Sequence, residues 1–448
     1  MPYEVDETHD PSLESWLESA NDPSADFPIQ NLPLCVFAET SGEPRPGTII
    51  GDLVLDLTEL ARRGLAELPH AFAQLSASER SSLRRRLVDL LRVDGDDALR
   101  RDPSRDACFH PLNEARLRRP AAFGDYTDFY ASVHHATNVG SMFRPDNPLL
   151  PNYKWIPVAY HGRASSVDLS GMLVTRPEGQ QAPAEEGGAP AFGPCKMLDY
   201  ELEMGIVVAG ENSLGRPVPM EDAEERILGL CLLNDWSARD LQKWEYQPLG
   251  PFLAKSFATT VGPFLVTMEA LAPFRCPPLE RPAGDPAPMP HLDSEHNRER
   301  GGIDISLEVH LRTEEMRDRA VPPVKLSTGN LKSMYWTPAQ MIAHHTSNGC
   351  NLQPGDLLGT GTVSGPARES RGSLLELTWD GDPWSDPPVK APGTQRTPIE
   401  LPTGETRTFL ADGDEVILKG YCERDGYRRI GFGECRGVVS PAKESARA

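Results

Sequence analysis

The chain has 448 residues, with 45 basic and 66 acidic side chains and a formal net charge of −21. This length suffices for two or three domains with a large core. The negative charge argues against nucleic acid and anionic membranes as partners, and an anionic substrate would need arginines and lysines gathered locally. No apolar run approaches the length of a membrane span, and residues 1–10 lack the basic start and apolar core of a signal peptide.

The eight cysteines are scattered and include no Cys-x-x-Cys pair. Several lie in apolar runs, such as the one at 230–232. This pattern is typical of reduced core thiols in a cytoplasmic protein, and not of a disulfide framework or a zinc site.

The first part of the chain reads as a small β-rich domain with helical decoration, over residues 1–120. Its predicted elements, in order, are an acidic arm at 1–28, strands at 31–38 and 47–57 with a turn at 42–44, and helices at 58–68 and 78–93. No residue of this part carries obvious chemistry.

The second part, residues 121–448, is predicted to be a larger mixed domain, mainly β. Its predicted elements are a helix at 125–137, an irregular loop at 138–152, strands at 156–160, 198–208 and 227–233, a helix beginning at 234–237 with Ser237 and Asp240 spaced as caps, an edge-type strand at 303–311, a helix at 337–347 starting near Pro338, and hairpin turns at 412–413 and 425–426.

The segment 198–208 organises the candidate chemistry. Its first half alternates apolar and acidic residues, while its second half is apolar on both faces, which is typical of a buried strand. Glu201 and Glu203 would then lie roughly 6.7 Å apart, two rises of a strand. Buried carboxylates that close repel each other and raise their pKa values, and a hard divalent cation with oxygen ligands relieves this repulsion. An amphipathic strand with a solvated acidic edge explains the alternation equally well.

Two further acids suit the same ion. Asp128 is predicted on the helix at 125–137, and Asp235 ends the core strand at 227–233, although an acid in the position of Asp235 is more often a helix cap. His135 follows Asp128 by seven residues, on the same face of the predicted helix, and is a candidate general base. A surface pair is the alternative for His134 and His135.

Donors follow downstream of the acids. Arg239 and Gln242 are spaced i, i+3 on a helix, and Tyr246, Lys255 and Thr259 come next; a solvated helix face and loop would account for them as well.

The glycine-rich turn at 359–365 lacks the Gly-Lys-Ser/Thr of a phosphate loop. Glu376, predicted in the middle of a strand, needs a partner if it is buried.

Together these segments resemble the fumarylacetoacetate hydrolase family in its long two-domain form. The carrying motifs are DYTDFY (125–130), HATNVG (135–140), YHGRASS (160–166), LDYELEMG (198–205), NDWSARDLQKWEYQPLGPFLAKSF (234–257) and HHTSNGCNLQPGDLLGTGTVSG (344–365). The resemblance implies a small N-terminal SH3-like β-barrel, a large C-terminal mixed β-sandwich roll, and a homodimer with its active site in the large domain.

The resemblance also implies roles for individual residues. Asp128, Glu201, Glu203 and Asp235 match calcium ligands, and Asp235, Lys255 and Thr259 match a second, magnesium-type site, where Lys255 could serve only through its backbone carbonyl. His135 matches the base and Glu376 its partner, and Arg239, Gln242 and Lys255 match the groups around the developing negative charge. The matches to substrate contacts are Tyr130, Arg144, Tyr160, Tyr246 and Thr362.

The implied reaction is hydrolysis of the carbon–carbon bond of a 1,3-diketone diacid, fumarylacetoacetate, to fumarate and acetoacetate, the last step of tyrosine and phenylalanine breakdown. A sister activity on the same scaffold, acylpyruvate hydrolysis or oxaloacetate decarboxylation, would share the carboxylates. A catalytically silent binding protein would lack the base or its partner acid, and both His135 and Glu376 are present.

Overall fold

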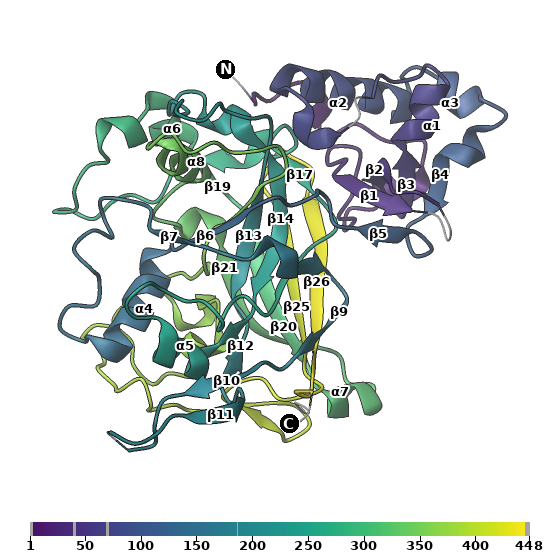
Figure 1. Cartoon of the computed structure of the whole chain (residues 1–448). Coiled ribbons are helices and arrows are strands. Elements are labelled where there is room, and N and C mark those ends of the chain that lie inside the picture. The colour runs from purple at the N-terminus through teal and green to yellow at the C-terminus, as the bar shows by residue number, and fades with distance from the viewer. Residues whose placement is uncertain (1–2, 39–41, 69–70, 186, 444–448) are drawn as a thin grey trace.

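The computed structural model describes residues 3–38, 42–68, 71–185 and 187–443 (Figure 1). The N-terminal residues form a separate body at the upper right of the view, beside the long strands of the larger part. Both parts contain β-sheets decorated by helices, so the predicted class, mainly β with some α, is confirmed. The boundary near residue 120 stays a prediction.

The N-terminal part is built on a five-stranded antiparallel sheet. Its strands, in spatial order, are β4 (Phe109–Pro111), β3 (Leu53–Asp56), β2 (Arg45–Ile50), β1 (Leu34–Ala38) and β5 (Arg116–Arg118). The helix α1 (Leu57–Arg62) begins where the Asp56 side chain accepts the backbone N–H groups of Thr58 and Glu59. The longer α2 (Ala77–Leu91) starts with a capping box formed by Ser76 and Glu79. A short α3 (Ala98–Arg101) follows.

The two parts share contacts across a continuous interface. Leu34 and Leu265 exchange backbone hydrogen bonds of 2.9 Å in both directions. Arg80 of α2 forms a buried ion pair with Glu269 of the larger part, with Nε and Oε1 3.0 Å apart. One apolar cluster includes side chains of both parts, so neither part completes its core alone.

In the described residues, the larger part contains two large sheets and four small two-stranded ones. The eight-stranded sheet runs β7 (Ala159–His161), β6 (Tyr126–Phe129), β22 (Leu357–Gly359), β13 (Leu202–Val208), β14 (Ile227–Asp235), β16 (Thr259–Val261) and β8 (Val167–Leu169), with β17 (Val266–Thr267) beside β14. The five-stranded sheet runs β21 (Val324–Asn330), β20 (Ser306–Arg312), β25 (Glu415–Cys422), β26 (Ile430–Ser440) and β9 (Met172–Thr175). Leu232 of β14 belongs to the same buried cluster as Leu307 of β20 and Phe432 of β26, so the sheets face each other across one core.

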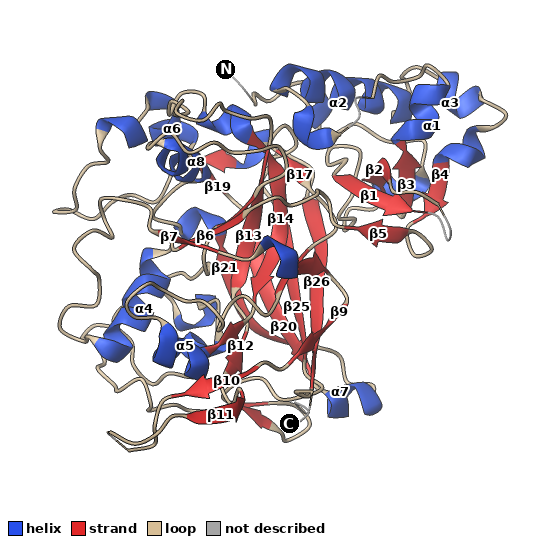
Figure 2. Ribbon diagram, in the orientation of Figure 1, coloured by secondary structure: helices blue, strands red, loops and turns tan. Residues whose placement is uncertain are grey.

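Helices flank these sheets. Figure 2 shows α4 and α5 beside the strands, with α6 and α8 above them in the same view. Their bounds are α4 (Val133–Phe143), α5 (Arg239–Glu245), α6 (Glu295–Arg300), α7 (Glu314–Asp318), α8 (Pro338–Thr346) and α9 (Leu374–Leu377). The small paired strands are β10 (Glu178–Gln181) with β11 (Ala191–Pro194), β12 (Leu198–Asp199) with β15 (Ser237–Ala238), β18 (Arg275–Cys276) with β19 (Gly302–Ile303), and β23 (Ile399–Glu400) with β24 (Thr406–Arg407). None of the helices in the described ranges is long and apolar enough to cross a membrane.

The predicted helix at 125–137 is wrong in its first half. Residues Tyr126–Phe129 form β6, which pairs in parallel with β22 and antiparallel with β7. The helix begins only after Ser132, whose side chain accepts the His135 N–H, and it runs through part of the predicted loop to Phe143. Pairing on both sides of β6 supplies hydrogen bonds that a local helical reading does not anticipate.

Five other local predictions are wrong. The turn at 412–413 does not close a hairpin, because β24 before it pairs with β23 and β25 after it pairs with β20 and β26. The segment 198–208 is two strands, because β12 pairs with β15 in a small sheet of its own and β13 joins the large sheet only after residues 200–201. Glu376 lies in the short helix α9. The strand β14 extends through Asp235, and α5 starts after Ala238 without a side-chain cap, so the predicted caps at Ser237 and Asp240 do not form and Asp235 is not a cap either. The strand β20 lies inside its sheet between β21 and β25, and is not at an edge.

Candidate active site and metal centre

Four acidic side chains meet inside the larger part, as the sequence predicts. Asp128 extends from β6, Glu203 from β13, Asp235 from the end of β14, and Glu201 from the break between β12 and β13. One carboxylate oxygen of each lies within 4.8 Å of those of the others, and all four residues are buried. Strands β6, β22, β13 and β14 are neighbours in the sheet, so adjacent backbones deliver the cluster.

Two of these carboxylates lack counter-charges of their own. Burial raises the pKa of Asp128, and the charge of Asp235 raises it further. Burial likewise raises the pKa of Glu203, with Asp128 and Asp235 adding to the effect. Asp128 Oδ1 and Glu203 Oε1 have no hydrogen-bond partner among the described residues. An all-oxygen, anionic donor set with unpaired lone pairs fits a hard divalent cation such as Ca²⁺ or Mg²⁺.

Glu201 has a different environment, because two cations contact it. Lys255 Nζ donates to Glu201 Oε2, and Arg239 Nη1 lies 2.8 Å from Glu201 Oε1. Burial alone would raise the pKa of Glu201, but the charges of Lys255 and Arg239 outweigh it and hold that pKa well below the usual range. Glu201 is therefore ionised without help from a metal ion.

Asp235 is the most heavily hydrogen-bonded member of the cluster. It accepts hydrogen bonds from Lys255 Nζ at 2.7 Å, from Tyr160 OH at 2.8 Å and from Thr259 Oγ1 at 3.0 Å. Burial disfavours the Lys255 ammonium, yet Asp235 and Glu201 raise its pKa above the usual range. Lys255 thus enters the cluster as an ammonium donor that offsets part of its negative charge, and its Nζ offers no lone pair to a metal.

A histidine–carboxylate pair lies beside the cluster. His135 Nδ1 is 2.7 Å from Glu376 Oε2, and His135 Nε2 is 3.8 Å from Glu201 Oε1, so the second ring nitrogen faces the acids. An ionised carboxylate only accepts hydrogen bonds, which places the ring proton on Nδ1 and leaves the Nε2 lone pair free in the neutral ring.

Glu376 is held by three further donors. Asn138 Nδ2 and Ser373 Oγ each donate at 2.8 Å, and Ser364 Oγ donates at 3.1 Å. Burial raises the pKa of Glu376, but His135 and the hydrogen bonds from Asn138 and Ser373 lower it more strongly, to about 2. Sequence reasoning missed Asn138, Ser364 and Ser373; the spacing of Asn138, three residues after His135 on one helix, was the available signal.

His134 points elsewhere. Its ring packs edge-on against Trp384 with centroids 4.5 Å apart, and burial lowers the pKa of His134 to about 4. The Trp384 indole also donates to Asn138 Oδ1 at 2.9 Å. His134 therefore acts as a neutral packing residue beside the His135–Glu376 pair, and not as a surface group.

The structure places the residues predicted to contact substrate in different environments. The ring of Tyr130 stands edge-on to His135, with centroids 5.2 Å apart, and Tyr160 is bonded to Asp235. Thr362 Oγ1 is buried without a partner among the described residues. Tyr246 caps the end of α5, the helix that carries Arg239 and Gln242.

Arg144 lies at the surface. It is exposed at the C-terminal end of α4, where its Nη2 donates to Pro148 O at 3.1 Å. Burial raises the pKa of Tyr130, and the charge of Arg144 acts in the opposite direction. Arg144 is thus linked to the site electrostatically and not by direct contact with the acids.

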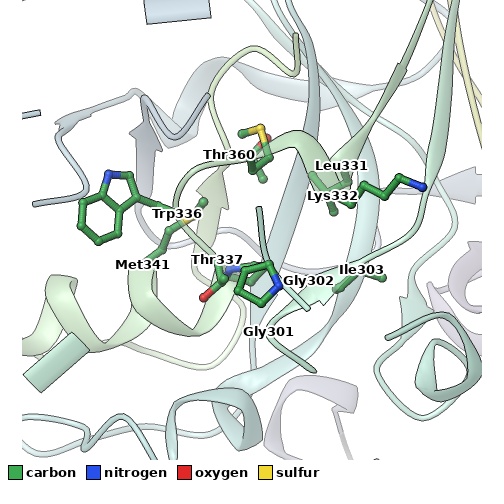
Figure 3. A pocket seen from close by; sticks show the side chains of 12 residues that line it. Gly301, Gly302, Ile303, Leu331, Lys332, Trp336, Thr337, Met341 and Thr360 are labelled. Carbon is green, nitrogen blue, oxygen red and sulfur yellow. The ribbon is translucent and has the colours of Figure 1, made fainter. Parts of the chain in front are cut away.

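A small cavity lies beside Thr360, the residue that directly follows β22. Its walls include Ile303, Trp336, Met341 and Thr360 (Figure 3). Thr360 Oγ1 accepts the backbone N–H of Met204 in β13, which connects this wall to the site. The volume, about 10 Å³, holds roughly one water molecule. The cavity cannot hold a diketone diacid.

Comparison with known proteins identifies relatives along nearly the whole chain. The family model for the fumarylacetoacetate hydrolase C-terminal region matches residues 125–440, and the model for the fumarylacetoacetase N-terminal region matches residues 30–120. A fumarylacetoacetase from Caenorhabditis elegans is 48% identical over 94% of this chain and 97% of its own. The human fumarylacetoacetase is 47% identical over 96% of this chain and 99% of its own, and that of Dictyostelium discoideum 46% over 96% and 98%.

Proposed function

The chain belongs to the fumarylacetoacetate hydrolase family, and we propose how its residues divide the hydrolysis of fumarylacetoacetate, to fumarate and acetoacetate, among themselves. One observation carries the proposal. The His135–Glu376 pair directs a free ring nitrogen at a buried set of four carboxylates, flanked by Lys255 and Arg239. This arrangement combines a base, a metal-binding donor set and fixed positive charge in one place.

Asp128, Glu201, Glu203 and Asp235 would hold the divalent cation, with Ca²⁺ as the first candidate. When bound, the cation supplies Lewis acidity to the oxygens of the diketone. A second, Mg²⁺-type site is proposed at Asp235, Thr259 and the backbone carbonyl of Lys255. The unpaired oxygens of Asp128 and Glu203 support cation binding, since each is otherwise a buried acceptor without a donor.

His135 acts as the general base. Its Nε2 takes a proton from water, the oxygen of that water adds to a carbonyl carbon, and the Glu376 carboxylate stabilises the resulting imidazolium through Nδ1. The carbon–carbon bond then breaks, its electron pair stays on the leaving fragment as an enolate, and protonation of that carbon completes acetoacetate.

Arg239, Gln242 and Lys255 face the charge that develops on the leaving fragment. The Arg239 guanidinium is buried, and its Nη1 donates to Gln242 Oε1 at 3.2 Å, so the two side chains are held together. Preorganised donors in a site that excludes water stabilise a developing enolate more than its neutral precursor.

Tyr130, Tyr160, Tyr246 and Thr362 are proposed to line the bound diacid. Arg144 is proposed to attract a terminal carboxylate of the substrate. Its positive charge locally offsets the net charge of −21, which would otherwise repel an anion. We also propose a cytoplasmic homodimer, on the strength of the family resemblance and the reduced cysteines, six of which are buried.

A direct assay tests this function against the sister activities. Loss of diketone absorbance is followed with fumarylacetoacetate, and turnover is compared with an acylpyruvate and with oxaloacetate. We expect kcat/KM to be highest for fumarylacetoacetate and to vanish after chelation. A preference for acylpyruvate or oxaloacetate would overturn the substrate assignment while leaving the metal site standing.

A further inference from the structure

Asp199 is a buried carboxylate that the proposed reaction does not use. It lies in β12, two residues before Glu201, and its side chain is fully buried. Arg239 Nε donates to Asp199 Oδ2 at 3.0 Å, and Arg239 Nη2 lies 2.9 Å from the same oxygen. One edge of the guanidinium is therefore fixed by Asp199, and its remaining nitrogen, Nη1, is directed at Glu201 and Gln242.

The carboxylate of Asp199 is itself fixed by backbone groups. Leu374 N donates to Oδ1 at 2.8 Å and Leu375 N donates to Oδ2 at 3.0 Å, both from the first residues of α9. Tyr200 N donates to Oδ1 at 2.9 Å. The helix α9 carries Glu376, so a single carboxylate contacts both the segment that orients the base and the arginine beside the acids.

We propose that Asp199 is the positioning residue of Arg239, holding the guanidinium in the orientation that meets the leaving enolate. A long, flexible arginine pays a conformational entropy cost when it is ordered, and the anchored carboxylate removes that cost before substrate arrives. The inference rests on the proposed function, because it concerns the charge that develops in that reaction.

The variant that tests this is Asp199→Asn. An asparagine of nearly equal shape has one acceptor oxygen and one NH2 group. Suppose that the amide oxygen accepts the backbone N–H groups of Leu374 and Tyr200. The NH2 group then faces the Leu375 N–H and the Arg239 guanidinium, which are donors as well, so no hydrogen bond can form there. The amide therefore cannot hold Arg239 while keeping the backbone contacts. We expect kcat to fall about 10- to 100-fold with a smaller change in KM, as for other partners that orient active-site groups.

Asp414 provides a matched control. It is also fully buried, accepts from Arg407 Nε at 2.8 Å and Nη2 at 2.9 Å, and accepts a backbone N–H from Ala411 at 2.8 Å. None of these partners belongs to the proposed site. Asp414→Asn loses the same kind of contact, so it is expected to lower the melting temperature while kcat stays at the wild-type value. An unchanged kcat in Asp199→Asn, or an equal loss in both variants, would overturn the inference.

A double variant covers the case in which Asp199→Asn fails to fold. In Arg239→Gln the carboxylate of Asp199 has lost its counter-charge, and the added Asp199→Asn substitution removes an unpaired buried anion. If Asp199 acts through Arg239, the double variant and Arg239→Gln alone have the same kcat. A further drop in the double variant would show an independent effect and refute the inference.

The same set of measurements separates this inference from the function on which it rests. A wild-type protein inactive on fumarylacetoacetate would refute both. An active wild type, an impaired Arg239→Gln and a fully active Asp199→Asn would refute the role of Asp199 alone.

Discussion

His135 Nδ1 and Glu376 Oε2 are 2.7 Å apart although 241 residues separate them in the chain. Each belongs to a different helix, α4 or α9, and each is buried. Their hydrogen bond fixes both the orientation and the protonated nitrogen of the imidazole, which leaves Nε2 facing the carboxylates.

His135→Asn should nearly abolish turnover, by about 100- to 10,000-fold, since a positioned base contributes that much. Calcium binding, measured by calorimetry, should stay near wild type because His135 is not among the acids. His134→Asn is the matched control. It should have a mild effect on kcat, because His134 packs on Trp384 and does not face the cluster. An inactive His134→Asn beside an active His135→Asn would refute the assignment of the base.

Glu376→Gln should reduce kcat less than His135→Asn does, since the base remains but loses the acid that orients and stabilises its protonated form. The pH dependence of stability should change as well. The pKa of Glu376 is lowered from 4.5 to about 2, so its contribution to stability is complete above pH 4.5 and is lost as pH falls toward 2. Unfolding free energies measured from pH 2 to 5 should show a shallower acid slope in the variant; parallel slopes would contradict this.

Glu203→Gln should change stability in opposite directions with and without metal. In chelated protein the amide removes a buried charge whose pKa is raised by burial and by Asp128, while its oxygen still accepts the Gly361 N–H, which lies 3.1 Å from Glu203 Oε2. The melting temperature should therefore rise, by an increment that grows as pH increases above 4.5, where the unfolded carboxyl ionises.

In the presence of calcium, Glu203→Gln should instead lower the melting temperature. The loss of a charged ligand weakens calcium binding, and this binding stabilises the native state by mass action. Melting curves of wild type and variant, in chelator and in a calcium series, check both halves. A wild-type melting temperature unaffected by exhaustive chelation would refute a metal site at these acids.

The sequence predicts well those parts of the fold whose signals are local. The apolar run at 227–233 lies in β14, Pro338 starts α8, and Asp425-Gly426 connects β25 to β26. The sequence also predicts that Asp128 lies close to the other three acids, although it predicts Asp128 on a helix. In the structure β6 delivers it, through pairing with β22 and β7.

The rest depends on contacts between distant segments, which no local pattern encodes. Asp199 appears in the sequence as one more acid of an alternating strand, and its partners lie on α5 and α9. Glu376 looks like a strand residue within Leu374–Leu377, yet it sits in a helical turn capped by Ser373. The donors that hydrogen-bond to its carboxylate come from three different segments. Such groups become visible only when the chain is folded.

The last prediction concerns Arg80, which joins the N-terminal part to the larger one. Arg80→Met replaces it by an apolar side chain of similar length and leaves Glu269 buried and unpaired; Glu269 Oε2 already lacks a partner among the described residues. Breaking a buried ion pair on one side costs about 3–5 kcal/mol. The denaturant midpoint should fall accordingly, while kcat of the folded protein should stay unchanged, since no proposed site residue lies before Asp128. Arg85→Met, at a 49% exposed arginine of the same helix, should shift stability by less than about 0.5 kcal/mol. A loss of kcat in folded Arg80→Met would show that the N-terminal part acts on the chemistry, and equal shifts in the two variants would show that the Arg80–Glu269 pair does not stabilise the interface.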